Sequence, residues 1–263
     1  MLYYKKIENA ESSEWVILLH GIGGNSNVFK KQLDLLSTKY NLLLIDLHGH
    51  GNSKQHNLMT IRTKERHVNL KYVCDDIVEV MDKEEIKKAN FMGISLGTIV
   101  ILNMSIYYEE RIESMILGGA IIGMTMRSKI ILNFVDFIRQ VIPYIAFRQL
   151  MGNALMPFNK HKNSRKVYLK ASDTLEKKEF VEWFKLLKYH LKNFNVYEYR
   201  IPTLYVMGDK DFVFLPSIQK HIHSNNIKII SDCGHVCNVD CSEKFNDICM
   251  NFLLSTGRTC VTR

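Results

Sequence analysis

The stretch Asn90-Phe91-Met92-Gly93-Ile94-Ser95-Leu96-Gly97-Thr98 decides how this chain is interpreted, because an apolar run ends there at Gly-x-Ser-x-Gly and a helix-forming stretch begins. Two glycines, each two residues from Ser95, let a strand and a helix approach closely at a turn too tight for side chains. Such a turn strains its central residue and raises the hydroxyl above the sheet, close to the Leu96 amide at the helix start. We interpret Ser95 as a nucleophile. The alternative is a strand-to-helix connection with a solvated serine, and the rest of the chain must decide between them.

The size and composition of the chain fit one large α/β domain with a single core. The 263 residues are 46% hydrophobic and 24% charged, as in ordinary globular proteins. The sequence has no uncharged apolar run of about 18 residues that could span a bilayer. Its start, Met1-Leu2-Tyr3-Tyr4-Lys5-Lys6, lacks the apolar core of a secretion signal, so we expect a cytoplasmic location and reduced cysteines.

The positive charge is concentrated in one segment. Residues 121–200 hold 15 Lys and Arg against 6 Asp and Glu, a net of +9, whereas the remaining residues hold 20 against 21. A solvated helical surface explains this excess, and a basic lid facing an anionic substrate or an anionic membrane is the alternative. No zinc-finger, basic-zipper or RNA-recognition signature is present, so we predict no nucleic-acid partner.

The run Cys233-x3-Cys237-x3-Cys241 encloses His235 and raises the question of a metal site. Its spacing differs from that of common zinc sites, and helical periodicity explains it at least as well. His48 and His50 have no carboxylate or cysteine beside them at metal-site spacing, so loop structure explains them better. We predict no metal and no cofactor.

Strand patterns recur along the chain and alternate with helical ones, as in a parallel sheet covered by helices. The predicted strands are Tyr3–Ile7, Trp15–Leu19, Asn41–Ile45, Ala89–Met92, Ser114–Leu117, Pro202–Met207 and Lys228–Ile230. We expect residues 1–120 and 200–255 to form the core and residues 256–263 a flexible tail.

Residues 121–199 lack the alternation of strand and helix patterns. Their sequence predicts an all-helical cap inserted between two core strands. Helical patterns cover Ser128–Val141, Tyr144–Met156, Ser164–Ala171 and Leu175–Leu191. We expect most of its large apolar residues to pack on the core and a minority to face a ligand. These residues are Met124, Met126, Phe134, Phe137, Tyr144, Phe147, Met151, Met156 and Phe158.

The residues that a serine nucleophile needs occur in a usable order. A serine hydroxyl needs a base to remove its proton and a carboxylate to orient that base. An acidic turn and then His235 follow the two last predicted strands, so all three groups reach the same edge of the sheet. The glycine-rich loop after Leu19 offers the Ile22 amide, with that of Leu96, to an oxyanion.

These motifs together resemble the α/β-hydrolase superfamily, over nearly the whole chain. The matching segments are His20-Gly21-Ile22-Gly23-Gly24, Asp46-Leu47-His48-Gly49-His50-Gly51-Asn52-Ser53, Gly93-Ile94-Ser95-Leu96-Gly97, Gly208-Asp209-Lys210-Asp211 and Gly234-His235. The resemblance implies an α/β fold with a mostly parallel eight-stranded sheet, flanking helices and an inserted helical cap. It also implies that the chain is a serine esterase or a lipase-like member of the superfamily. It selects Asp211 over Asp209 as the acid and His235 as the base. His48 departs from the family's usual Arg.

From this resemblance we expect hydrolysis of a small or medium acyl ester with Ser95, Asp211 and His235 as catalytic triad. The substrate would be a small molecule with an apolar acyl group. One alternative is a lysophospholipase, a thioesterase or a lyase like those of menaquinone synthesis, acting on an anionic substrate. A ligand-binding receptor that uses the same fold is another alternative. The oligomeric state stays open.

Overall fold

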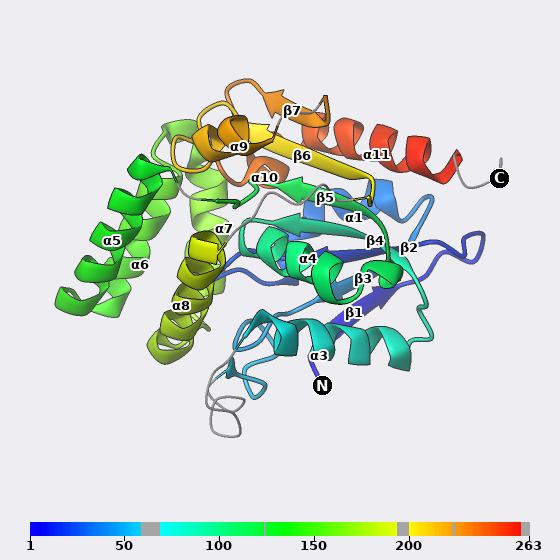
Figure 1. Cartoon of the computed structure of the whole chain (residues 1–263), viewed down its shortest axis with the longest axis horizontal. Helices are drawn as coiled ribbons and strands as arrows, with labels where there is room; N and C mark the ends of the chain where they lie inside the picture. Colours follow the sequence, from blue (N-terminus) through cyan, green and yellow to red (C-terminus); the bar gives the residue numbers. More distant parts are fainter. Residues whose placement is uncertain (59–68, 124, 194–199, 223–224, 259–263) are drawn as a thin grey trace.

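The computed structural model describes residues 1–58, 69–123, 125–193, 200–222 and 225–258, which form a sheet with helices on both faces (Figure 1). The strands are β1 (Tyr4–Ile7), β2 (Trp15–Leu19), β3 (Asn41–Ile45), β4 (Ala89–Ile94), β5 (Ile112–Gly118), β6 (Thr203–Gly208) and β7 (Ile227–Ile230). Their order in the sheet is β1-β3-β2-β4-β5-β6-β7. β1 pairs antiparallel with β3, and all other pairs are parallel.

The expected α/β sheet is therefore present, but the described residues form seven strands where the resemblance implied eight. The seven strands are the segments in which the sequence shows strand patterns. The prediction of an eighth strand was wrong for this part of the chain, because it came from the resemblance and had no segment of its own in the sequence.

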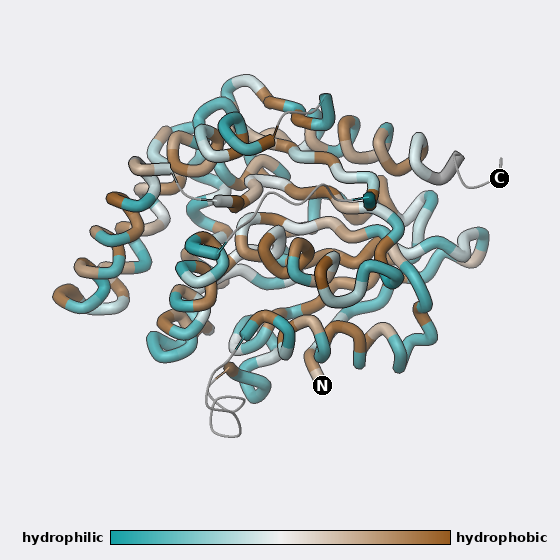
Figure 2. The backbone as a smooth tube through the Cα atoms, viewed as in Figure 1, coloured by the Kyte–Doolittle hydropathy of each residue, from teal (hydrophilic) through white to brown (hydrophobic). Residues whose placement is uncertain are grey.

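The central strands β2, β3, β4 and β6 are buried on both faces of the sheet, which explains why they are mostly apolar. In β2, Ile17 and Leu19 belong to the core on one face, and Val16 and Leu18 belong to the core on the other. Figure 2 shows this apolar centre as brown along the strands and the adjoining helices.

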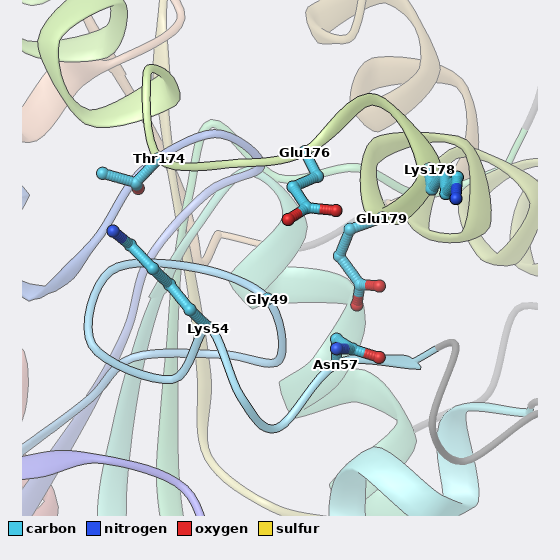
Figure 3. A pocket seen from close by; sticks show the side chains of 7 residues that line it. All are labelled: Gly49, Lys54, Asn57, Thr174, Glu176, Lys178 and Glu179. Carbon is cyan, nitrogen blue, oxygen red and sulfur yellow. The ribbon is translucent and has the colours of Figure 1, made fainter.

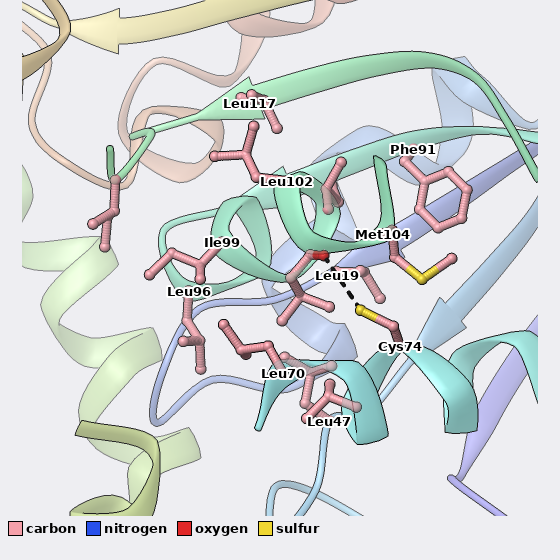
Figure 4. Packing of buried hydrophobic residues seen from close by; sticks show 14 of the residues in the cluster. Leu19, Leu47, Leu70, Cys74, Phe91, Leu96, Ile99, Leu102, Met104 and Leu117 are labelled. Carbon is pink, nitrogen blue, oxygen red and sulfur yellow. Dashed lines mark hydrogen bonds between the residues drawn. The ribbon is translucent and has the colours of Figure 1, made fainter. Parts of the chain in front are cut away.

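Helices α3 (Leu70–Lys83) and α4 (Leu96–Tyr107) cover one face, and α1 (Lys30–Leu36) and α11 (Ser242–Arg258) cover the other. α4 contacts both the sheet and α3, and ten of its twelve residues are buried. Figure 4 shows its side chains packed against both neighbours, with the Cys74 thiol 3.9 Å from the Val100 carbonyl oxygen. A helix buried on all sides needs the apolar sequence that follows Ser95.

Among the described residues between β5 and β6, four α-helices lie beyond the carboxyl ends of the parallel strands (Figure 1). They are α5 (Met126–Val141), α6 (Tyr144–Leu155), α7 (Lys162–Ser172) and α8 (Lys177–Asn193). Each starts within about two residues of the helical pattern in the sequence, which is the usual uncertainty of helix ends. Short elements complete the fold: η1 (Ser26–Phe29), η2 (Glu109–Arg111), η3 (Asn159–His161), α9 (Leu215–His221) and α10 (Cys237–Asp240).

The last helix is longer than the sequence indicated. α11 continues to Arg258, so the predicted tail was wrong for residues 256–258. The Ser255 hydroxyl donates to the Phe252 carbonyl oxygen at 2.7 Å, and the Thr256 hydroxyl donates to that of Leu253 at 2.9 Å. The remaining tail residues, 259–263, lie outside the described residues.

Of the helices that the structure describes, none is long and apolar enough to cross a membrane.

Candidate active site

The predicted site residues all follow strands that end at the same edge of the sheet. Ser95 follows β4, Asp211 follows β6, His235 follows β7 and Ile22 follows β2. The carboxyl ends of parallel strands meet at this edge, where open α/β sheets place their sites.

Ser95 occupies a strained turn between β4 and α4. Its backbone has φ 55° and ψ −115°, a conformation that costs a non-glycine residue about 1–3 kcal/mol. The Thr98 hydroxyl and backbone N–H both donate to the Ser95 carbonyl oxygen, at 2.6 and 2.9 Å. At Gly97 a Cβ would lie 2.1 Å from the Leu19 carbonyl oxygen. The turn is therefore possible only because residue 97 has no side chain.

The structure brings Ser95, His235 and Asp211 into one buried hydrogen-bonded chain. The Ser95 Oγ lies 2.9 Å from His235 Nε2, and His235 Nδ1 lies 2.7 Å from Asp211 Oδ2. Gly119 allows the His235 backbone to lie close to the end of β5, since a Cβ at residue 119 would lie 2.4 Å from the His235 carbonyl oxygen. The arrangement suits transfer of the serine proton to an imidazole that a carboxylate orients.

Asp211, and not Asp209, contacts His235. Asp209 Oδ1 accepts from the Cys233 backbone N–H at 3.1 Å, and its Oδ2 lies 2.9 Å from Lys210 Nζ. These contacts tie the acidic turn to the loop that carries His235. Asp209 therefore supports the turn and is not part of the hydrogen-bonded chain of Ser95, His235 and Asp211.

Phe214 supports this site and was not predicted from the sequence. Its backbone N–H donates to Asp211 Oδ1 at 3.0 Å, and its ring centroid lies 5.0 Å from that of His235. The two rings are tilted by 36° to each other, a geometry in which an aromatic ring packs against the imidazole. No sequence motif marks this residue, although it lies three positions after the acid.

Two backbone N–H groups lie close to Ser95. Ile22 and Ser95 both line the cavity at the site, and Leu96 is the first residue of α4, directly after the serine. Among the hydrogen bonds between described residues, none is donated by the backbone N–H of Ile22 or Leu96. Both donors are available to an anion, and the positive end of the α4 dipole adds to their effect.

Two buried histidines hold the glycine-rich loop that contains Ile22. His20 Nε2 accepts from the Leu47 N–H at 2.9 Å, and His50 Nε2 accepts from the Gly23 N–H at 2.9 Å. Burial lowers the pKa of His20, and it lowers the pKa of His50 well below the usual range. Both imidazoles are neutral at pH 7, as two acceptor nitrogens require, so they position the loop by hydrogen bonding.

His48, which occupies the position of the family's usual Arg, still pairs with a carboxylate. Its Nε2 lies 2.6 Å from Asp76 Oδ2, and its side chain is buried. Its carbonyl oxygen accepts from the Trp183 indole N–H at 2.9 Å. His48 therefore links the loop after β3 to α3 and to α8, in agreement with the structural interpretation of this loop.

The cavity beside Ser95 is small and mainly apolar. Its volume is about 50 Å³, and Leu155, Met156, Val167 and Tyr168 line it from α6, α7 and the segment between them. A cavity of this size holds only a few water molecules. Tyr168 was not predicted, and burial raises its pKa to about 12, so the phenol stays protonated.

The sequence led us to expect that most of nine large apolar residues of the cap pack on the core and that a minority face a ligand. Of these nine, Met156 lines this cavity. The expectation is wrong for Met126, Phe134 and Phe137, which are 73%, 58% and 60% exposed. Their side chains lie on the outer face of α5, which the sequence pattern cannot distinguish from the inner face. Met124 lies outside the described residues.

A second cavity, of about 250 Å³, lies between the loop after β3 and the start of α8 (Figure 3). Lys54, Glu176, Lys178 and Glu179 surround it, and Glu179 Oε1 accepts from the Leu58 N–H at 2.6 Å. This hydrogen bond joins α8 to the core. The cavity includes none of the predicted site residues.

The cysteines near His235 are buried thiols. Burial raises the pKa of Cys237 to about 12 and that of Cys233 further, so neither is a thiolate at neutral pH. All five described cysteines are free, and Cys260 lies outside the described residues. Within the described part of the chain, no group of three or more His, Cys, Asp or Glu side chains is arranged to hold a metal ion.

Comparison with known proteins gives matches that extend over most of the chain. A family model described as "alpha/beta hydrolase fold" matches residues 14–240. The chain is 22% identical over 274 aligned positions to 3-oxoadipate enol-lactonase 1 of Acinetobacter baylyi, covering 95% of this chain and 92% of that protein. It is 25% identical over 261 positions to the 2-hydroxy-6-oxononadienedioate/2-hydroxy-6-oxononatrienedioate hydrolase of Escherichia coli, covering 92% and 88%. A carboxylesterase structure from Nitrososphaera gargenis has a TM-score of 0.78 at 16% identity, covering 98% and 95%.

Proposed function

Because the chain belongs to the α/β-hydrolase fold family, we propose that it is a serine hydrolase that cleaves a carboxylic ester through an acyl-enzyme intermediate. The observation that carries this proposal is the buried chain from Ser95 Oγ through His235 to Asp211, with contacts of 2.9 and 2.7 Å. The strained backbone of Ser95 at the start of α4 supports it.

In the proposed reaction, Ser95 Oγ attacks the ester carbonyl carbon while His235 Nε2 takes the serine proton. Asp211 keeps the other imidazole nitrogen protonated and stabilises the imidazolium. The amides of Ile22 and Leu96 bind the oxyanion of the tetrahedral intermediate. His235 then gives the proton to the leaving alcohol, and the acyl group stays on Ser95.

The second half of the reaction uses the same groups on water. His235 removes a proton from a water molecule, whose oxygen attacks the acyl carbon. Collapse of this second intermediate returns the proton to Ser95 and releases the carboxylic acid. The balance needs only ester and water, so the proposal includes no metal and no cofactor.

The substrate is proposed to be a small molecule with a short apolar acyl group. The cavity of about 50 Å³ beside Ser95 leaves little room, and its Leu155, Met156 and Val167 side chains are apolar. The name of the relative from Acinetobacter baylyi describes a lactonase, and a lactone is a cyclic ester. Residues 121–199 are proposed to act as a cap that sets this specificity, on a core of residues 1–120 and 200–255.

An anionic substrate is a second candidate, favoured by the net charge of +9 in residues 121–200 and by the dioate in the name of the relative from Escherichia coli. With an anionic substrate, the enzyme would be a thioesterase, a lysophospholipase or a lyase like those of menaquinone synthesis. The cytoplasmic location and the absence of a nucleic-acid partner stay predictions.

Hydrolysis of nitrophenyl acetate, butyrate, hexanoate and octanoate tests the proposal. We expect repeated turnover that is fastest on the two short esters and falls to the buffer rate in Ser95→Ala. A ligand-binding receptor would give at most slow turnover on all four esters. Comparison of a neutral with an anionic ester, as salt is raised, tests the second candidate, because screening lowers kcat/KM only where charge steers the substrate.

A further inference from the structure

Helix α5 carries an apolar stripe on its outer face. We define the α5 apolar stripe as Met126, Ile130, Phe134, Phe137 and Val141, which are 73%, 64%, 58%, 60% and 58% exposed. Their spacing of three or four residues places them on one side of the helix. In Figure 1, α5 is the outermost helix at the left of the molecule, and Figure 2 shows brown segments along it.

The stripe is not the face by which α5 packs on the protein. Ser128 and Leu132 are buried on the opposite side, and Ile138 packs against the core. The helix therefore has two apolar faces, of which only one is covered. An apolar surface of this kind on a folded chain marks an interaction site.

A basic surface adjoins the stripe. We define the α6–α7 groove as the cavity of about 540 Å³ between these two helices. Ile145, which is 65% exposed, lines the groove and lies four residues after Val141. The charged residues of the groove are Arg148, Lys162, Arg165, Lys166, Lys170 and Asp173.

The positive charge of the groove is mostly uncompensated. Asp173 pairs with Arg148 at 2.7 Å. Within the part of the chain that the structure describes, no salt bridge involves Lys162, Lys166 or Lys170. A partner that covers both surfaces must offer apolar groups to the stripe and negative charge to the groove.

We propose that the α5 apolar stripe and the α6–α7 groove dock on an anionic lipid surface. Apolar side chains beside exposed lysines match acyl chains beneath anionic headgroups. A second copy of this chain fits less well, because face-to-face contact would bring two segments of net charge +9 together. The helix would lie on the membrane, since no described helix is long and apolar enough to cross it.

The proposed docking face and the candidate active site lie on two sides of α7. Ser164, Val167 and Tyr168 line the cavity beside Ser95, whereas Lys162, Lys166 and Lys170 line the groove. Docking would therefore place the candidate site one helix away from the lipid surface. The docking proposal itself does not depend on the chemistry at Ser95.

Cosedimentation of the full chain with vesicles tests the proposal. The probes are phosphatidylcholine vesicles with about one third phosphatidylglycerol, and vesicles of phosphatidylcholine alone. We expect binding to the anionic vesicles that weakens as salt is raised, and at least about tenfold weaker binding to the neutral ones. Absence of binding to the anionic vesicles, or equal binding to both, would overturn the proposal.

Two variants localise the surface. Phe134→Ser with Phe137→Ser should weaken binding by about tenfold or more, because two aromatic rings lose contact with lipid. The triple variant of Lys162, Lys166 and Lys170 to Gln should weaken binding by about 100-fold, at about fivefold for each lysine. Circular dichroism and thermal unfolding check that both variants fold.

A matched control changes the same charge elsewhere. Lys39, Lys87 and Lys220 are exposed, and their change to Gln should alter vesicle binding by less than about threefold. An equal loss in the control variant would show that total charge, and not this face, drives binding, which would contradict the proposal. A dimer in solution that Phe134→Ser and Phe137→Ser convert to a monomer, without vesicle binding, would assign the stripe to a second copy instead.

Discussion

The change Asp211→Asn tests the proposed orientation of His235. Asp211 Oδ1 accepts from the Phe214 N–H at 3.0 Å, while Oδ2 lies 2.7 Å from His235 Nδ1. An Asn that keeps the first bond must turn its NH₂ group toward His235. The imidazole then carries its proton on Nε2 and cannot accept one from Ser95.

The expected effect is large because the site is buried. The side chains of His235 and Asp211 are 2% and 1% exposed, so water cannot replace the carboxylate. We expect kcat to fall by about 10⁴-fold, equivalent to about 5.5 kcal/mol in the activation barrier. The assay is steady-state hydrolysis of nitrophenyl acetate, with thermal unfolding to show that the variant is folded.

Asp209→Asn is the matched control. It removes the same charge at a position two residues before Asp211, and the Asp209 side chain does not contact His235. We expect it to reduce kcat by less than about tenfold. If Asp211→Asn keeps at least a tenth of the wild-type kcat, or if Asp209→Asn has the larger effect, the proposed role of Asp211 is wrong.

Three further predictions concern stability, specificity and pH. Gly97→Ala should lower the free energy of unfolding by about 3 kcal/mol, because its Cβ would lie 2.1 Å from the Leu19 carbonyl oxygen; a urea-denaturation loss below about 0.5 kcal/mol would contradict this close approach. Tyr168→Ala should raise kcat/KM for nitrophenyl hexanoate relative to acetate by about tenfold, because Tyr168 lines the small cavity; an unchanged ratio would exclude it as a limit on acyl length. Burial lowers the pKa of His190 from 6.5 to about 4, so the unfolded chain binds more protons between these values and stability falls as pH drops through this window. Between pH 7 and pH 5 the wild type should lose about 1–2 kcal/mol more than His190→Gln in urea unfolding, and equal losses would show that His190 does not carry this pH dependence.

Much of the fold was predictable because it depends on local patterns. The segments Val16–Leu19 and Leu42–Ile45 are continuous apolar runs, and β2 indeed faces a core on each side. The glycines around Ser95 predicted a tight turn, and the observed φ of 55° is the conformation that such a turn imposes. The eighth strand had no such pattern and is not found among the described residues.

The supporting contacts of the candidate site were not predictable, because they join segments that are distant in sequence. His50 reaches the Gly23 N–H across 27 positions, and the Phe214 ring packs on His235. Neither contact leaves a periodic signal in the sequence. The size of the cavity beside Ser95 likewise depends on how α6 and α7 pack.

The outer face of α5 shows the limit of periodicity as a guide. Phe134 and Phe137 recur at helical spacing, as residues of a buried face do, yet both are more than half exposed. The sequence pattern shows that a helix is amphipathic but does not show which apolar face finds a partner. The basic excess in the same segment was visible from the sequence alone, whereas its position beside the stripe required the structure.

Covalent labelling with a serine-directed fluorophosphonate tests the central claim most directly, because the reagent reacts with an activated serine and needs no knowledge of the natural substrate. We predict one adduct per chain, located by peptide mass spectrometry on Ser95, absent from Ser95→Ala and slowed in Asp211→Asn. Undiminished labelling of Ser95→Ala, or no labelling of the folded wild type, would contradict the assignment of Ser95 as nucleophile.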